Sequence, residues 1–131
     1  MFQKEFYSHL GKLLYAVADI DQVISKEERN ALHSIVKKEL SPNENNIDEF
    51  GTDISYYTEF EFDVLTDQVA TSEDTFNSFI NFVEENKKHF DSKIKNLTIH
   101  LASEIAKAYE GTSKKEEDLI EKLKNKLKEI N

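Results

Sequence analysis

The spacing of apolar residues along the chain restricts the fold more than any other feature. In most segments apolar residues recur three or four positions apart, which places them along one side of a helix. Clear examples are residues 2–19, 76–83, 94–108 and 119–130. Residues 54–68 fit either a helix or a strand, but no other segment could pair with a strand there. The pattern therefore predicts an all-α fold.

The ambiguous segment 54–68 carries both kinds of periodicity. From Phe60 to Val64, apolar and acidic residues alternate as they would on a strand. The helical interpretation gives an apolar face formed by Tyr57, Phe60, Val64 and Leu65. We predict a helix, because a lone strand would leave its backbone groups without partners.

Acidic residues of the same segment divide into two kinds. Glu59, Asp63 and Asp67 are one helical turn apart and form a row of like charges, which is typical of a solvated face. Glu61 falls inside the predicted apolar arc instead. A buried carboxylate needs a partner, which can be a lysine, a backbone amide or a metal ion.

Two capping boxes mark helix starts near the two ends of the chain. In Ser25 to Glu28 and in Ser113 to Glu116, the serine hydroxyl can accept the glutamate amide while the carboxylate reaches back to the serine amide. At this offset of 88 residues other positions also match. The matched pairs include Leu13 with Leu101, Ala18 with Ala106, Lys26 with Lys114, Leu32 with Ile120 and Ile35 with Leu123. Two quasi-repeated helix–loop–helix units would explain the matches, and so would chance similarity between two capped hairpins.

The length of 131 residues and the 38% hydrophobic content suit one domain with its own core. We predict that residues 1–131 form a single compact bundle of about six to seven helices. The chain has no cysteine, which excludes disulfides and thiolate metal sites and agrees with a cytoplasmic location. No apolar run approaches the ~18 residues of a membrane span, so we expect no membrane insertion.

Charge is distributed unevenly along the chain. The net charge is −9, which argues against nucleic-acid binding because phosphate contacts need clustered basic residues. Thirteen acids and no lysine or arginine lie between Glu39 and Glu85, and so do eight of the fourteen aromatic residues. An acidic block this rich in aromatic residues should fold. We therefore expect one strongly negative face, suited to a protein partner with a basic surface.

The run from Leu13 to Glu28 resembles the TerB-like family. That family shows Ala-Asp-Gly-x-Ile-Ser-x-x-Glu between two helices, and Asp21, Ile24, Ser25 and Glu28 match it. Ile20 and Gln22 depart from the pattern, where the family has Ala and Gly. The stretch from Ala106 to Glu116 resembles a degenerate copy. The resemblance implies an all-helical domain without known catalytic activity, a link to tellurite and envelope-stress systems, and an acidic site for a divalent cation.

The loop acids also fit part of a calcium-binding pattern. Asp19, Asp21, Ser25 and Glu28 take positions three, five, nine and twelve of an EF-hand loop. Position one would be a valine and position six a glutamine, so a complete EF-hand is disfavoured. These acids can simply bond to loop amides and complete the cap. Alternatively, Asp19, Asp21, Glu28 and a distant Glu61 form a weak site for calcium, magnesium or manganese.

Enzyme signatures are missing from the sequence. The four histidines show no HExxH spacing, and the three glycines form no phosphate-binding loop. We expect a non-enzymatic stress-response or interaction module that binds a divalent cation or a basic protein. The alternative is a small hydrolase-type enzyme that uses scattered acidic residues.

Overall fold

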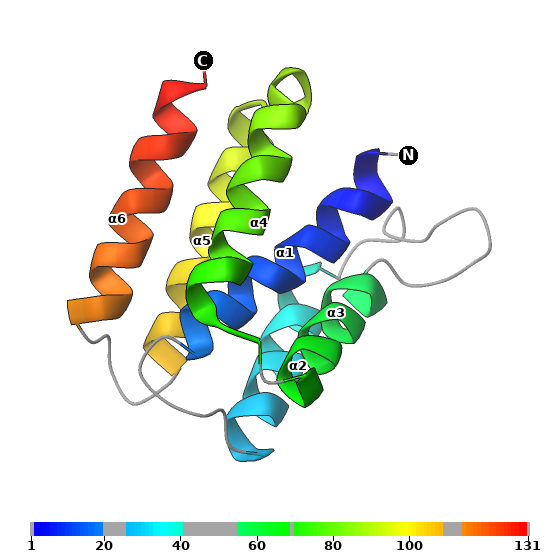
Figure 1. Ribbon diagram of the computed structural model, residues 1–131. Coiled ribbons are helices and arrows are strands. Elements are labelled where there is room, and N and C mark those ends of the chain that lie inside the picture. The colour runs from blue at the N-terminus through cyan, green and yellow to red at the C-terminus, as the bar shows by residue number, and fades with distance from the viewer. Residues whose placement is uncertain (1, 20–25, 41–54, 69, 109–113, 131) are drawn as a thin grey trace.

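The computed structural model describes residues 2–19, 26–40, 55–68, 70–108 and 114–130, which form six α-helices and a short 3₁₀ turn (Figure 1). The helices are α1 (Phe2–Asp19), α2 (Lys26–Leu40), α3 (Ser55–Gln68), α4 (Ser72–Glu85), α5 (Ser92–Ala108) and α6 (Lys114–Glu129), with η1 (Lys87–His89) between α4 and α5. The described residues contain no strand, so the all-α prediction and the helix predicted within 54–68 are confirmed. None of these helices is long and apolar enough to cross a membrane.

Side-chain caps define the start of two helices. The Thr71 hydroxyl accepts the Asp74 amide at 3.2 Å at the start of α4, and the Asp91 carboxylate accepts the Ile94 amide at 2.9 Å at the start of α5. Helices α2 and α6 begin directly after Ser25 and Ser113, and their first residues are 114 − 26 = 88 positions apart, as in the sequence match. Both serines lie outside the described residues, so their caps stay predictions.

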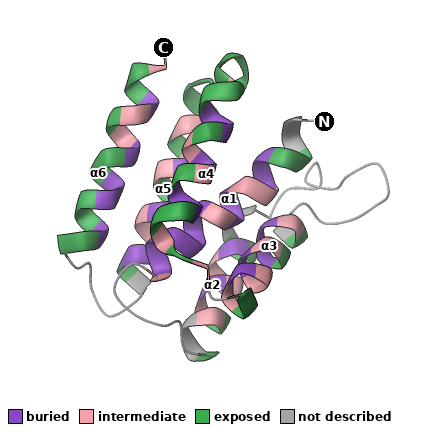
Figure 2. Ribbon diagram, viewed as in Figure 1, coloured by how far each residue is buried: buried purple, intermediate pink, exposed green. Residues whose placement is uncertain are grey.

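Helix α1 forms the centre of the bundle. It packs against α3, α4 and α5, and Figure 2 shows it buried along most of its length. Leu10, Leu13, Leu14 and Val17 are completely buried, as the helical spacing predicts. Each such side chain stabilises the fold by about 1.5–3 kcal/mol relative to leaving it exposed. The core is therefore organised around α1.

Gly11 allows α3 to approach α1 unusually closely. A Cβ atom at Gly11 would lie 2.6 Å from the Thr58 carbonyl oxygen and 3.0 Å from the Cβ of Glu61. The Thr58 hydroxyl also donates a hydrogen bond of 2.6 Å to the carbonyl oxygen of Tyr7. These contacts set the rotation of α3 about its own axis, because its backbone lies directly on α1.

The predicted apolar face of α3 is wrong in part. Phe62 is completely buried, whereas Phe60 is 54% exposed. Leu65 is buried as predicted, and Tyr57 is half-buried. The aromatic and aliphatic residues of α3 occur on most of its sides, so their spacing does not determine which side is buried. The close approach of α3 to α1 at Gly11 determines the buried side instead.

Candidate functional site

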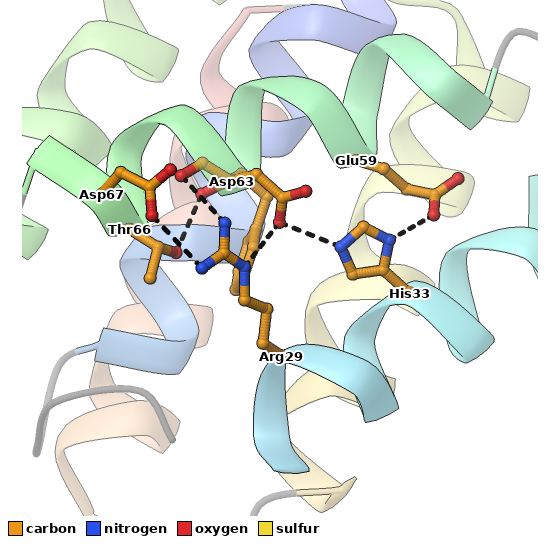
Figure 3. A network of polar contacts seen from close by, with 7 residues as sticks. Arg29, His33, Glu59, Asp63, Thr66 and Asp67 are labelled. Atoms are coloured by element: carbon orange, nitrogen blue, oxygen red, sulfur yellow. Dashed lines mark hydrogen bonds and ion pairs between the residues drawn. The ribbon is translucent and has the colours of Figure 1, made fainter. Parts of the chain in front are cut away.

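Helices α2 and α3 meet through a network of charged side chains (Figure 3). Arg29 and His33 lie one turn apart on α2, and Glu59, Asp63 and Asp67 lie at the same spacing on α3. Residues four apart share one side of a helix, so each row presents its side chains together. The basic row of α2 faces the acidic row of α3. We call these five residues the α2–α3 network.

His33 connects two carboxylates. Its Nδ1 contacts Glu59 Oε1, and its Nε2 lies 2.9 Å from Asp63 Oδ1. Burial lowers the pKa of His33, but hydrogen bonds to Asp63 and Glu59 outweigh burial and leave this pKa above its ordinary value. The protonated ring can donate a hydrogen bond to each carboxylate at the same time, which the neutral ring cannot.

Arg29 completes the network next to His33. Its Nε donates to Asp63 Oδ1 at 2.8 Å, and its Nη2 donates to the Asp63 carbonyl oxygen at 3.3 Å. Its Nη1 lies 3.3 Å from Asp67 Oδ1. The hydrogen bond to Asp63 is the main reason that the pKa of Arg29 is raised. One Asp63 oxygen therefore receives both basic residues, which makes Asp63 the centre of the network.

The prediction that Glu59, Asp63 and Asp67 form a solvated face holds for Asp67 and is wrong for Glu59 and Asp63. Glu59 is only 8% exposed, and Asp63 is half-buried. A signal for this pairing was present in the sequence, because Arg29 and His33 have the same four-residue spacing as the acids. The spacing of residues within one helix does not show which other helix packs against it. Only the tertiary structure therefore shows that the basic residues of α2 pair with the acids of α3.

Acids of the block between residues 39 and 85 do not all gather on one face. Those of the network turn towards α2, whereas Glu84 on α4 forms an ion pair of 2.5 Å with Lys126 on α6. The expectation of a single negative face is therefore wrong for the described acids, and Glu44, Asp48, Glu49 and Asp53 lie outside the described residues.

Two exposed aromatic rings lie on α3 beside the network. Tyr56 and Phe60 are 51% and 54% exposed, and their rings stack with 5.7 Å between centroids. Tyr56, Phe60, Asp63 and Asp67 are four, three and four residues apart, so they follow one stripe of the helix. We call these four residues the acidic–aromatic stripe.

The structure describes the side chains of two of the four predicted cation ligands, Asp19 and Glu61. Asp19 ends α1, and burial raises its pKa. Glu61 is half-buried on α3 beside Gly11. Asp21 lies outside the described residues, and so does the side chain of Glu28, which belongs to the first turn of α2. The cation site formed by these four residues stays a prediction.

Asp19 lies close to Tyr15, which is not among the residues of the predicted site. The hydroxyl of Tyr15 donates to the Ala70 carbonyl oxygen at 2.7 Å. Burial, together with the nearby Asp19 carboxylate, raises the pKa of Tyr15 to about 12.

Within the described ranges, no three His, Cys, Asp or Glu side chains are positioned to hold a metal ion.

The described elements define a small all-helical bundle domain built around a central helix. The chain matches the family model of tellurite resistance protein TerB over residues 8–128, which include nearly the whole chain. It therefore belongs to the TerB family, as the motif between Leu13 and Glu28 indicated. Comparison with curated proteins and with solved structures gives no match.

Proposed function

We propose that this TerB family member is a non-enzymatic, cytoplasmic interaction module of a stress response, and that its acidic–aromatic stripe binds a basic protein. The observation that carries the proposal is the stacked pair of exposed rings, Tyr56 and Phe60, next to the carboxylates of Asp63 and Asp67. Large exposed aromatic residues are enriched where proteins bind one another.

The chemistry of the stripe favours a cationic partner. Aromatic rings carry negative charge on their faces and attract lysine and arginine side chains. The bundle already contains one such contact, because Lys4 Nζ lies 5.1 Å from the centroid of the Tyr57 ring. The side chain of Asp67 is 72% exposed and can reach a second cation. An arginine-rich helix or loop would satisfy both features at once.

Binding of a labelled arginine-rich peptide, followed by fluorescence anisotropy, tests this proposal. We expect Tyr56→Ala with Phe60→Ala to weaken binding most, and Asp67→Asn to weaken it less. Added salt should also weaken binding, because exposed charges are screened within ~8–10 Å at physiological ionic strength. Glu117→Gln is the matched control, since it removes an exposed acid of α6.

The proposal fails if Glu117→Gln weakens binding as much as Asp67→Asn does. Binding would then follow the net charge of −9 and not this surface. The proposal also fails if removing both rings leaves the affinity unchanged.

Two other functions stay predictions. A divalent cation at Asp19, Asp21, Glu28 and Glu61 would raise the melting temperature in ~1 mM calcium, magnesium or manganese, since ligands that bind only the folded state stabilise it. Asp21→Asn should remove that gain. A small hydrolase would be revealed by turnover of ester or phosphate substrates that survives repurification and is lost when acidic residues are substituted.

A further inference from the structure

A basic groove lies between α5 and α6, separate from the acidic–aromatic stripe on α3. It has a volume of about 250 Å³. Its lining residues are Lys95, Asn96, Ile99, Lys124, Leu127 and Lys128. Three of these six are lysines and none is acidic. Figure 1 shows α6 and α3 on different sides of the bundle, so the two surfaces can be tested independently.

The floor of the groove is apolar and its rim is cationic. Leu127 is almost completely buried, and Ile99 packs against the core beside it. Lys124 and Lys128 are one turn apart on α6, and Lys95 comes from α5. Among the described residues, none of the three lysines has a carboxylate within ion-pair distance. These three lysines therefore form no ion pair with the part of the bundle that the structure describes.

The other flank of α6 shows the opposite arrangement. There Lys126 forms its ion pair with Glu84 on α4, and Lys122 Nζ lies 5.7 Å from the centroid of the Phe76 ring. All four lysines from 122 to 128 belong to the same two turns of α6, but within the described ranges only Lys122 and Lys126 have such partners. This contrast provides a matched internal control.

Helix stability explains only part of the lysine pattern. Cations in the last turn of a helix interact favourably with its dipole, which accounts for Lys126 and Lys128. Lys95 lies in the first turn of α5, where the dipole disfavours a positive charge. Lys95 is therefore not explained by the dipole of its own helix, and no described carboxylate forms an ion pair with it, so an acidic group of a partner would interact favourably there.

We propose that the groove between α5 and α6 binds an acidic amphipathic helix of a partner protein. The helix would place an apolar side chain on the half-buried Ile99, and its flanking carboxylates would contact Lys95, Lys124 and Lys128. This is the usual way in which an amphipathic helix occupies a groove between two helices. The proposal does not depend on the function proposed for α3.

Extended polyanions suit this groove less well than a single helix does. The net charge of −9 repels a membrane surface or a nucleic acid over a wide area. A short acidic helix meets only the local cluster of three lysines. The half-buried Ile99 and the concave shape also favour an inserted apolar side chain over a flat, purely electrostatic contact.

The probe for this proposal is a fluorescein-labelled helical peptide of about sixteen residues, with a leucine stripe flanked by glutamates. Fluorescence anisotropy compares two double variants. One carries Lys124→Gln and Lys128→Gln, and the other carries Lys122→Gln and Lys126→Gln. Both double variants remove two positive charges from the same helix. We expect the first to weaken peptide binding about fivefold and the second to leave it unchanged. Circular dichroism checks that both variants keep their helices.

Three results would overturn the proposal. The first is equal loss of affinity in the two double variants, which would indicate attraction by net charge alone. The second is undiminished binding of a peptide with glutamines in place of the leucines, because the apolar floor would then have no role. The third is binding of phosphatidylserine vesicles or single-stranded DNA through Lys124 and Lys128 without binding of the peptide.

Discussion

The α2–α3 network and the groove between α5 and α6 place basic residues at the same helical spacing with opposite results. Arg29 and His33 on α2 contact carboxylates of α3, whereas Lys124 and Lys128 on α6 form no ion pair with the described residues. In the network the charges hold two helices together. In the groove they line the surface that we propose for a partner helix. The spacing of basic residues on a helix therefore does not tell whether they serve the fold or a partner, because that depends on the facing helix.

The quasi-repeat makes the same point. An offset of 88 relates α2 to α6, and it places Glu117 and Glu121 where α2 has Arg29 and His33 (29 + 88 = 117; 33 + 88 = 121). Both glutamates are exposed. Core positions such as Leu32 and Ile120 match across the offset and are both buried. The repeat therefore keeps the apolar side of the hairpins but not the charges at these two positions.

The largest effect should come from Gly11→Ala, which tests whether close packing places α3 and its network. The new Cβ would meet the Thr58 carbonyl oxygen, which belongs to the backbone and cannot rotate away. We expect a loss of about 3 kcal/mol in the free energy of unfolding, at the upper end for overpacking. Urea denaturation measures it. Helix propensity alone predicts a gain of about 1 kcal/mol, so a stabilised variant would contradict the packing argument.

Asp63→Ala should have the next largest effect, because it removes the acceptor shared by Arg29 and His33. We expect a loss of about 1–2 kcal/mol, since two donors lose a partly buried partner. Asp67→Ala is the control and should change stability by less than about 1 kcal/mol, because its side chain is largely exposed. Equal effects of the two substitutions would show that Asp63 is not the centre of the network.

A smaller effect should appear as a pH dependence of stability. The pKa of His33 is raised in the folded state, so its contribution is complete below pH 6.5 and is lost as the pH rises through the folded-state pKa. Burial lowers the pKa of His9 to about 4, so the contribution of His9 to stability rises as the pH approaches 6.5 and opposes the His33 trend near that pH. His33→Gln should flatten the decrease in melting temperature above pH 6.5. An unchanged slope in that variant would assign the pH dependence to other groups.

The smallest effect should come from Lys126→Gln, on the partnered flank of α6. The pair with Glu84 is exposed to solvent, and such pairs add little because water and salt screen them. We expect no resolvable change in melting temperature. A clear loss of stability would mean that this pair is structural, and it would disqualify the variant as a control for the groove.

Much of the fold could be predicted from the sequence, but the candidate site could not. Apolar spacing located α1, α4, α5 and α6. For α3 the same reasoning found the helix but placed Phe60 in the core. A helix with apolar residues on most sides offers several faces of similar hydrophobicity, so its own pattern cannot select one.

What the sequence determined by itself is local: where helices begin, which residues of α1 are buried, and the motif of the TerB family. These properties depend on contacts within a few residues, or on an apolar stripe that must be buried against any neighbour. The tertiary structure alone decided that His33 connects Glu59 with Asp63, and that Lys95 and Lys124 border one groove. Those pairings join residues far apart in the chain, and they follow from the way α3 lies on Gly11 and α6 lies on α5.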